Sequence, residues 1–389
     1  MGSNTWTGVA LVLLTAAITK TEDPFWSFAE ATLLLGILVL QLRSSERIWS
    51  TKRATRHRNV SVTSIANHKG GVGKTECAFH LIKRFASVSA KQILVVDCSL
   101  YGDLTRKLCG PSSELDRFEQ SNATIESMVE DCFRNPGRLE RIFGLGGAGF
   151  SARNHMLNVK ESALHSDAPS NLWIMASRRG VAAQSSRLHD EPATDALLSE
   201  SGALPHLCAA FRASLSTGQD DWLILFDTDG GEDHALTRFA LCASDKVVVP
   251  LRTDLDALPR LIRMFGFLNS LTVQGLSTAA ITQAFFNQVV VGDGNTPTQL
   301  APFKPRSKDT EANMERIRDF FDAAAKQYPA ILGAVASRKL SDTSDTFFTT
   351  VRNGGASFAR NADDPYATKP ETGVDADLDR LAERILPAV

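Results

Sequence analysis

The stretch that decides the fold is a glycine-rich loop at residues 67–75, which reads Asn67-His68-Lys69-Gly70-Gly71-Val72-Gly73-Lys74-Thr75. Glycines leave room for backbone N–H groups to turn inward around an anion. In a P-loop, a terminal lysine reaches the β- and γ-phosphates of a nucleotide and the next Ser/Thr hydroxyl holds Mg²⁺. Lys74 and Thr75 are the candidates for these two roles.

The segments on either side of the loop support this interpretation. Residues 60–66 are rich in β-branched side chains and predict a strand, and apolar residues recur at helical spacing from residue 78 to residue 86. A strand, a glycine loop and a helix together aim a helix N-terminus at a phosphate. The predicted nucleotide-binding residues of the loop are Gly70, Gly71, Val72, Gly73, Lys74, Thr75 and Glu76.

A second lysine near the start of the loop, Lys69, narrows the class of protein. The string resembles the deviant Walker A motif of the ParA/MinD family of P-loop ATPases, in the SIMIBI class. In that family the early lysine crosses a dimer interface and contacts the nucleotide of the other subunit. The resemblance implies this role for Lys69, catalytic roles for Lys69 and Lys74, ATP and Mg²⁺ as ligands, and a homodimer that forms on ATP binding.

An apolar run at residues 93–96 predicts a buried parallel strand that ends at Asp97. A similar strand in the family ends in an Asp-x-Asp-Pro-Gln-Gly-Asn-type stretch, which implies that Asp97 acts in catalysis near the Mg²⁺. The family's second aspartate, which positions or activates the attacking water, is replaced here by Ser99. A serine hydroxyl is a far weaker base than a carboxylate. The sequence therefore supports ATP binding better than hydrolysis, with Asp103 as a candidate substitute.

Two more strand ends carry candidate site residues. Residues 222–226 resemble the Walker B strand, so we expect Asp227 to hold Mg²⁺ through water; the alternative is an aspartate that caps the next helix. The family's Thr-Pro-Pro after this aspartate is replaced by Thr228-Asp229-Gly230. Residues 284–286 resemble a strand whose terminal asparagine reads adenine, here Asn287; the alternative is an asparagine in a turn.

These elements predict an α/β fold, a doubly wound and mostly parallel sheet with the nucleotide at the carboxyl ends of the strands. The predicted nucleotide-binding domain spans residues 59–389 and contains a long insertion at about residues 110–215. Further strands are expected at residues 172–175, 245–250 and 331–336, and an amphipathic helix at residues 377–386. Glycines 144, 146 and 149 match G-x-G-x-x-G, but a predicted helix precedes them, so we expect a loop there.

The composition limits the classes of function. With 389 residues and 43% hydrophobic side chains, the chain can build a sizeable core, and its net charge of −2 gives no overall basic footprint for nucleic acid. A local basic patch in the C-terminal half stays open as a DNA contact or as a solvated face. None of the six cysteines forms a C-x-x-C pair, so we expect buried thiols and no zinc site.

Residues 1–58 predict a hydrophobic helical hairpin that anchors the chain to a membrane, followed by a basic linker. Residues 6–18 and 25–42 are apolar, and residues 43–58 carry six Lys or Arg side chains against Glu46 alone. This asymmetry predicts that the nucleotide domain faces the cytoplasm. Both stretches are shorter than the roughly 20 apolar residues of a full span. An interfacial hairpin, or a helix pair packed on the domain or a partner, is therefore an alternative.

Three functions from different classes fit the sequence. The first is a membrane-associated ATPase whose ATP-dependent dimer acts as a switch in DNA partition or in positioning of cargo, with DNA or a DNA-binding or cargo adaptor protein as its partner. The second is an ATP-binding membrane scaffold with little or no hydrolysis, because of Ser99. The third, a P-loop tyrosine kinase, is disfavoured because the chain has only three tyrosines and no tyrosine-rich tail.

Overall fold

The computed structural model describes residues 59–99, 101–109, 116–134, 150–161, 167–178, 198, 203–231, 234–289, 307–336, 347–352 and 373–385. The chain divides into two compact units, Met1–Arg56 with Pro136–Gly147, and His57–Asn135 with Ala148–Val389. All described residues belong to the second unit. The expected hairpin of residues 1–58 and glycines 144, 146 and 149 lie outside the described residues.

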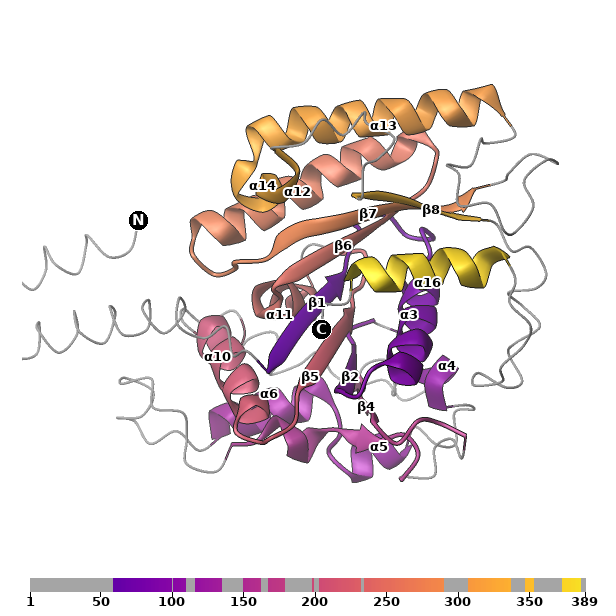
Figure 1. Ribbon diagram of the computed structural model, residues 1–389. Helices are drawn as coiled ribbons and strands as arrows, with labels where there is room; N and C mark the ends of the chain where they lie inside the picture. Colours follow the sequence, from indigo (N-terminus) through magenta and orange to yellow (C-terminus); the bar gives the residue numbers. More distant parts are fainter. Residues whose placement is uncertain are drawn as a thin grey trace, which may run out of the picture. The chain divides into compact units, whose positions relative to one another are not determined.

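The centre of the second unit is an eight-stranded sheet in the order β3-β4-β2-β5-β1-β6-β7-β8 (Figure 1). Neighbouring strands run parallel except β3 with β4. The strands are β1 Val60–Ile65, β2 Gln92–Asp97, β3 Leu157–Asn158, β4 Leu172–Met175, β5 Trp222–Asp227, β6 Lys246–Leu251, β7 Ala280–Val289 and β8 Phe348–Arg352. The strand before the glycine loop, β1, thus lies mid-sheet between β5 and β6.

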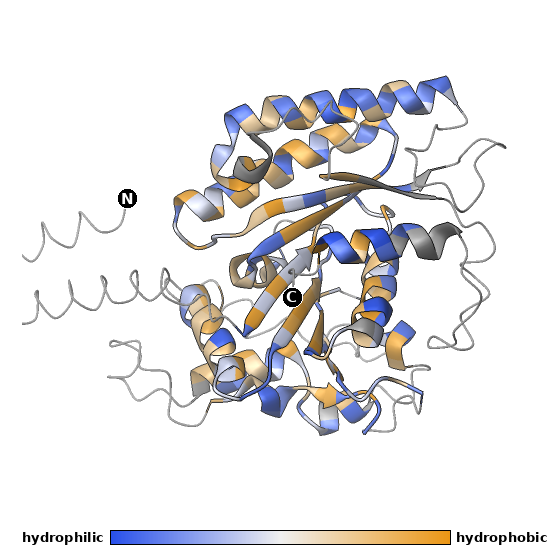
Figure 2. Cartoon of the chain, viewed as in Figure 1, coloured by the Kyte–Doolittle hydropathy of each residue, from blue (hydrophilic) through white to orange (hydrophobic). Residues whose placement is uncertain are grey.

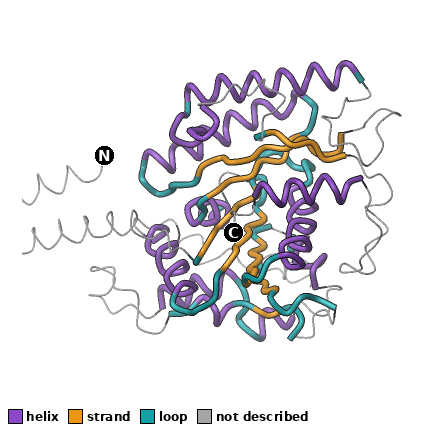
Figure 3. The backbone as a smooth tube through the Cα atoms, in the orientation of Figure 1, coloured by secondary structure: helices purple, strands orange, loops and turns teal. Residues whose placement is uncertain are grey.

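Helices cover both faces of the sheet, as a doubly wound fold requires (Figure 3). The helices are α3 Lys74–Val88, α4 Asp103–Cys109, α5 Asp116–Gln120, α6 Ile125–Arg134, α10 Ala203–Ser216, α11 Ala235–Ala243, α12 Leu258–Val273, α13 Lys308–Gln327, α14 Pro329–Ala336 and α16 Gly373–Ile385, with short 3-10 turns η2 Ala152–His155 and η3 Leu255–Ala257.

Three hydrophobic clusters hold the layers together. One joins α3, α4 and α16 to one face of the sheet. The other two lie on the opposite face, under α6, α10 and α11 in one half and under α12, α13 and α14 in the other. Successive residues of the central strands enter different clusters, because both faces of a parallel sheet are buried. Hydrophilic and hydrophobic residues alternate along α13, which has one face on this core (Figure 2).

The sequence-based strands at residues 60–66, 93–96, 172–175, 222–226, 245–250 and 284–286 are confirmed, with ends that shift by a few residues. The strand expected at residues 331–336 is wrong. These residues belong to α14, where Ile331 and Leu332 are fully buried, and the outer strand beside β7 is β8 instead. A short apolar run fits a buried helix as well as a buried strand, and Pro329 suits the first turn of a helix.

Two further expectations concern helices. The C-terminal amphipathic helix is confirmed as α16, which packs on α3. Across the part of the chain that the structure describes, no helix has both the length and the apolar content needed to cross a membrane.

Candidate nucleotide-binding site

The glycine loop leaves the carboxyl end of β1 and enters α3, so it lies at the edge of the sheet where β5 and β6 also end. The buried side chain of Asn67 holds the start of the loop in place. The Nδ2 atom of Asn67 donates to the carbonyl oxygen of Pro250 at 2.6 Å, and its Oδ1 atom accepts from the N–H of Lys69 at 2.8 Å. The loop is therefore fastened to β6, the neighbouring strand.

Two glycines of the loop need their lack of a side chain. Gly71 and Gly73 have positive φ angles of +70° and +84°, which L-residues rarely adopt. A Cβ atom on Gly73 would lie 2.1 Å from Nδ2 of Asn287, whereas a Cβ on Gly70 or Gly71 would meet nothing within 4 Å. The loop thus leaves open space on one side, as a phosphate cradle must.

Lys74 begins α3 and bends back over the loop. Its ammonium group donates to the carbonyl oxygen of Lys69 at 3.2 Å. Burial lowers the pKa of Lys74, while the negative charges of Asp227 and Asp229 act in the opposite direction. The two carboxylates thus favour the charged ammonium, which is the form that neutralises phosphate oxygens.

Asp227 ends β5 and is fully buried. No described residue donates a well-formed hydrogen bond to either of its carboxylate oxygens. Burial raises the pKa of Asp227 to about 8, and the charge of Asp97 adds to this effect, while the nearby Thr75 hydroxyl and Lys74 ammonium oppose it. A buried carboxyl group next to a hydroxyl offers the oxygen ligands that Mg²⁺ prefers, and the charge of the ion would favour loss of the carboxyl proton. Thr75 and Asp227 would hold that ion.

Asp97 lies opposite Asp227 in the register of β2 and β5, but it is engaged differently. Its Oδ1 atom accepts from the N–H and hydroxyl of Ser99, at 3.0 and 2.7 Å, and its Oδ2 atom accepts from the N–H and hydroxyl of Thr105, at 2.8 and 2.7 Å. Burial raises the pKa of Asp97 and these donors lower it. Asp97 thus ties β2 to α4, and its catalytic and metal roles stay predictions.

The early lysine has a partner within its own chain. Lys69 forms an ion pair with Asp254, which follows β6 and also pairs with Arg252 at 3.3 Å. The Lys69 side chain is 15% exposed and the Asp254 side chain is 37% exposed. Its contact across a dimer stays a prediction, and Lys69 would have to leave Asp254 to make that contact.

Asn287 and Glu76 complete the set of sequence-predicted residues. Asn287, two residues before the end of β7, donates through Nδ2 to the carbonyl oxygen of Val72 at 2.9 Å, so it supports the loop backbone. Burial would raise the pKa of Glu76, but hydrogen bonds from His80 and Lys107 lower it overall. The structure brings both residues to the loop, and adenine recognition by Asn287 stays a prediction.

Sequence reasoning left out three residues that shape this site. Asn67, within the loop, bonds to the carbonyl oxygen of Pro250, and Asp254 pairs with Lys69; both contacts join residues far apart in the sequence. A Cβ atom on Gly230 would lie 3.4 Å from the carbonyl oxygen of His68 and 3.6 Å from Nζ of Lys74, so the segment after β5 closes over the loop. In the sequence, the departure from the family pattern at Thr228-Asp229-Gly230 was the feature that pointed to this segment.

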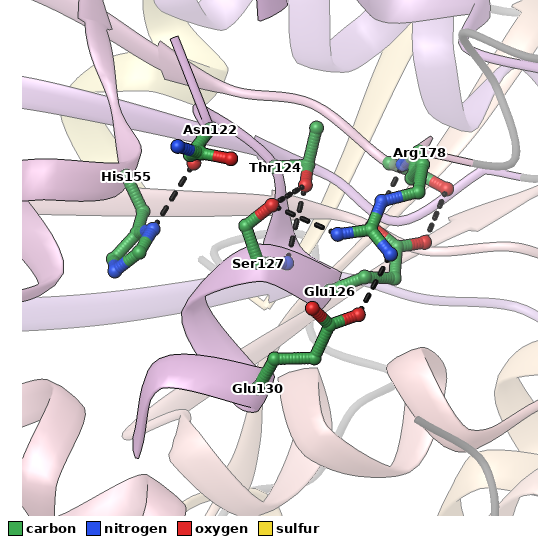
Figure 4. Close-up of polar contacts among 8 residues, drawn as sticks. Asn122, Thr124, Glu126, Ser127, Glu130, His155 and Arg178 are labelled. Atoms are coloured by element: carbon green, nitrogen blue, oxygen red, sulfur yellow. Dashed lines mark hydrogen bonds and ion pairs between the residues drawn. The ribbon is translucent and has the colours of Figure 1, made fainter. Parts of the chain in front are cut away.

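A second polar cluster lies at the start of α6 (Figure 4). Arg178, just beyond β4, donates to Glu130 at 2.7 Å and to Ser127 at 2.9 Å, and its backbone N–H donates to Glu126 at 2.7 Å. The hydroxyl of Thr124 accepts from the N–H of Ser127 at 3.2 Å. These groups satisfy one another and fasten α6 to the end of β4, which is a structural role.

Within the described ranges, no group of three or more His, Cys, Asp or Glu side chains is arranged to hold a metal ion. Five of the six cysteines are buried, as expected, and Cys242 is partly buried.

Comparisons with known proteins agree with this geometry. A family model described as an AAA domain (AAA_31) matches residues 60–277, more than half of the chain, so the chain belongs to that family. No curated protein matches the sequence. The structure is similar to that of a Cyanothece McdA variant in complex with ATP, with 16% identity, a TM-score of 0.52, and coverage of 84% of this chain and 95% of that one.

It is also similar to a putative plasmid partition protein from Borrelia burgdorferi B31 bound to AMPPNP. The identity is 15%, the TM-score is 0.50, and the match covers 83% of this chain and 97% of that one. The family match and these two similar folds agree with the resemblance of the glycine loop and its two lysines to the deviant Walker A motif of the ParA/MinD family.

Proposed function

We propose that this protein is a membrane-associated ATPase whose ATP-dependent homodimer acts as a molecular switch in DNA partition or in positioning of cargo. The observation that carries the proposal is Asp227, a fully buried carboxyl group beside the Thr75 hydroxyl and the Lys74 ammonium, whose oxygens accept no well-formed hydrogen bond from the described residues. Mg²⁺ bound there would neutralise charge on the nucleotide phosphates. Lys74 would hold the phosphates from within the chain, and Lys69 would reach the nucleotide of the second subunit.

The partition and positioning part of the proposal is supported by its relatives. The similar proteins are a McdA–ATP complex and a plasmid partition protein bound to AMPPNP. The proposed partners are therefore DNA or an adaptor protein that binds DNA or cargo. The membrane part is supported by the two apolar stretches of residues 1–58 and the basic residues after them, which orient the nucleotide domain toward the cytoplasm.

The test is chemical crosslinking of the purified full chain with and without ATP and Mg²⁺, alongside the variants Lys69→Ala and Lys74→Ala. We expect an ATP-dependent dimer in the wild type. Lys74→Ala should lose nucleotide binding, whereas Lys69→Ala should keep binding and lose the dimer. A dimer that is indifferent to ATP, or equal in all three proteins, would contradict the switch.

One observation favours a second function, an ATP-binding membrane scaffold with little turnover. The hydroxyl of Ser99 donates to Asp97 at 2.7 Å, so the position of the family's water-positioning aspartate is used for structure. Single-turnover hydrolysis by the full chain separates the two functions. ATP-dependent dimers without release of phosphate would favour the scaffold.

A further inference from the structure

The strand end that resembles the family's water-positioning site offers no available base here. Besides donating to Asp97, the Ser99 hydroxyl accepts from the N–H of Asp103 at 3.3 Å, and Ser99 is only 9% exposed. Asp97 already accepts hydrogen bonds from Ser99 and Thr105 at both of its oxygens. Hydrolysis would need a carboxylate from another segment.

The segment after β5 brings such a carboxylate to the loop. The N–H and hydroxyl of Thr228 donate to the carbonyl oxygen of Ile65 at 3.3 and 2.8 Å, which fixes this segment to the end of β1. Gly230 then lies against the P-loop, where a Cβ atom would be 3.6 Å from Nζ of Lys74. Asp229 lies between these two anchored residues, next to the part of the P-loop that carries Lys74.

The carboxylate of Asp229 is available for a ligand. One of its oxygens accepts from the N–H of Gly230 at 2.6 Å, which orients the side chain. The other accepts no hydrogen bond from any described residue, and the side chain is only half-buried. Its negative charge acts on the ammonium of Lys74, and a Cβ atom on the neighbouring Gly230 would lie 3.6 Å from the nitrogen of that ammonium.

We propose that Asp229 is the catalytic residue that positions and deprotonates the attacking water. This inference rests on the proposed ATPase function and names the base of that reaction. The water oxygen forms a bond to the γ-phosphorus as the bond from that phosphorus to the β–γ bridging oxygen breaks. The bridging oxygen keeps the electron pair and leaves on ADP. The proton of the water passes to Asp229 and from there to the released phosphate or to solvent.

Asp103 is the rival carboxylate, since its charge also acts on Asp227. It begins α4, its side chain is 51% exposed, and it lies 3.7 Å from Arg106, with which it forms an ion pair. Its carboxylate thus faces solvent and a guanidinium, whereas Asp229 lies between two residues that contact the end of β1 and the P-loop. The structure therefore favours Asp229, and the two residues are separable by mutation.

The experiment is single-turnover hydrolysis by the full chain, with enzyme in excess over radiolabelled ATP and Mg²⁺, together with ATP binding measured by calorimetry over a range of Mg²⁺ concentrations. The variant is Asp229→Asn, whose amide oxygen can still accept from Gly230 while the negative charge is lost. We expect the rate to fall about 100-fold, the low end of the range for a general base, with ATP affinity and its Mg²⁺ dependence changed by less than about threefold.

Asp103→Asn tests the rival base, and Asp319→Asn on the exposed side of α13 is the matched control for loss of one negative charge. A rate that stays within about twofold in Asp229→Asn, or a loss in Asp103→Asn alone, overturns the assignment. The assignment is also overturned if Asp229→Asn binds Mg²⁺–ATP more weakly and this weaker binding accounts for the whole loss of rate. If the wild-type protein binds ATP but does not hydrolyse it, the assignment of Asp229 as the base is overturned, while the ATP-dependent dimer switch is not. Protein that binds no ATP overturns the proposed function itself.

Discussion

At the scale of single residues, Asp227 links the site to the pH dependence of folding. Its pKa is raised to about 8 in the folded chain, while an aspartate in an unfolded chain ionises near pH 4. Between about pH 4 and pH 8 the folded chain therefore keeps a proton that the unfolded chain has released. Stability falls as the pH rises through this window, because the folded state binds more protons.

Asp227→Asn mimics the protonated acid and should remove this dependence. We expect the melting temperature of the wild type, without nucleotide or Mg²⁺, to fall relative to that of the variant from about pH 6 to about pH 8. One proton corresponds to a slope of at most about 1.4 kcal/mol per pH unit. Differential scanning calorimetry at several pH values measures it, and parallel curves for the two proteins would contradict the shifted pKa.

The second residue-scale prediction concerns Gly73. A Cβ atom there would lie 2.1 Å from Nδ2 of Asn287, and the φ of +84° disfavours any side chain. We expect Gly73→Ala to lose ATP binding and to lower the free energy of unfolding by about 1–3 kcal/mol. Gly266→Ala in α12 is the control, since its Cβ meets nothing within 4 Å. The control should be neutral or more stable by up to about 1 kcal/mol.

The spacing of residues along the sequence predicts the site residues that belong to a motif. It does not predict those that reach the site from a distant segment of the folded chain. Lys74, Thr75 and Asp227 stand beside a glycine loop or at a strand end, so spacing alone points to them. Asp254 reaches Lys69 from a loop far along the chain. Such a contact depends on the strand order, which spacing does not encode.

At the scale of elements, the ion pair between Lys69 and Asp254 closes the loop onto the segment after β6. Because Lys69 must leave Asp254 to reach a second subunit, Asp254→Asn should favour the dimer. A partly exposed pair contributes up to about 1 kcal/mol, so we expect up to about fivefold less ATP for half-maximal dimer in a crosslinking titration. Asp256→Asn, on the exposed side of η3, is the matched control. An unchanged midpoint for Asp254→Asn would contradict a restraining pair.

Another element-scale prediction tests how α10 is fastened to the sheet. The nearly buried guanidinium of Arg212 pairs with Asp245 at 3.1 Å and donates to the carbonyl oxygen of Ala243 at 2.9 Å. Arg212→Met should cost about 3 kcal/mol of unfolding free energy, because it leaves a buried charge without its partner. The more exposed pair of Arg84 with Asp379 gives the comparison. Arg84→Met should cost less than about 1 kcal/mol in urea unfolding, and equal losses would contradict the role of burial.

A comparison of elements explains why most strands were predicted correctly and why α14 was wrongly expected to be a strand. Runs such as residues 93–96 and 222–226 combine β-branched or aromatic side chains with a polar residue at the end, which is typical of buried parallel strands. Residues 331–336 are equally apolar but contain alanine and glycine, and they fold as α14. Apolar content alone does not separate these two structures; packing against α12 and α13 decides it.

For the whole molecule, the membrane proposal makes a prediction about location. The full chain should float with liposomes that contain anionic lipid, because residues 1–58 pair apolar stretches with six basic side chains. A chain that begins at residue 59 should stay at the bottom of the gradient and still bind ATP. Flotation of the shortened chain would place the membrane contact in the nucleotide domain.

The contact between Asn287 and Val72 has a consequence for how the molecule moves. Asn287 lies near the end of β7, a strand buried under α12, α13 and α14, and its amide donates to the backbone of the phosphate cradle. The cradle and that half of the sheet are thus mechanically coupled. Tightening of the cradle around a triphosphate would stiffen the three-helix layer, and a shift of that layer would reach the bound nucleotide through Asn287 and through the bond of Asn67 to Pro250.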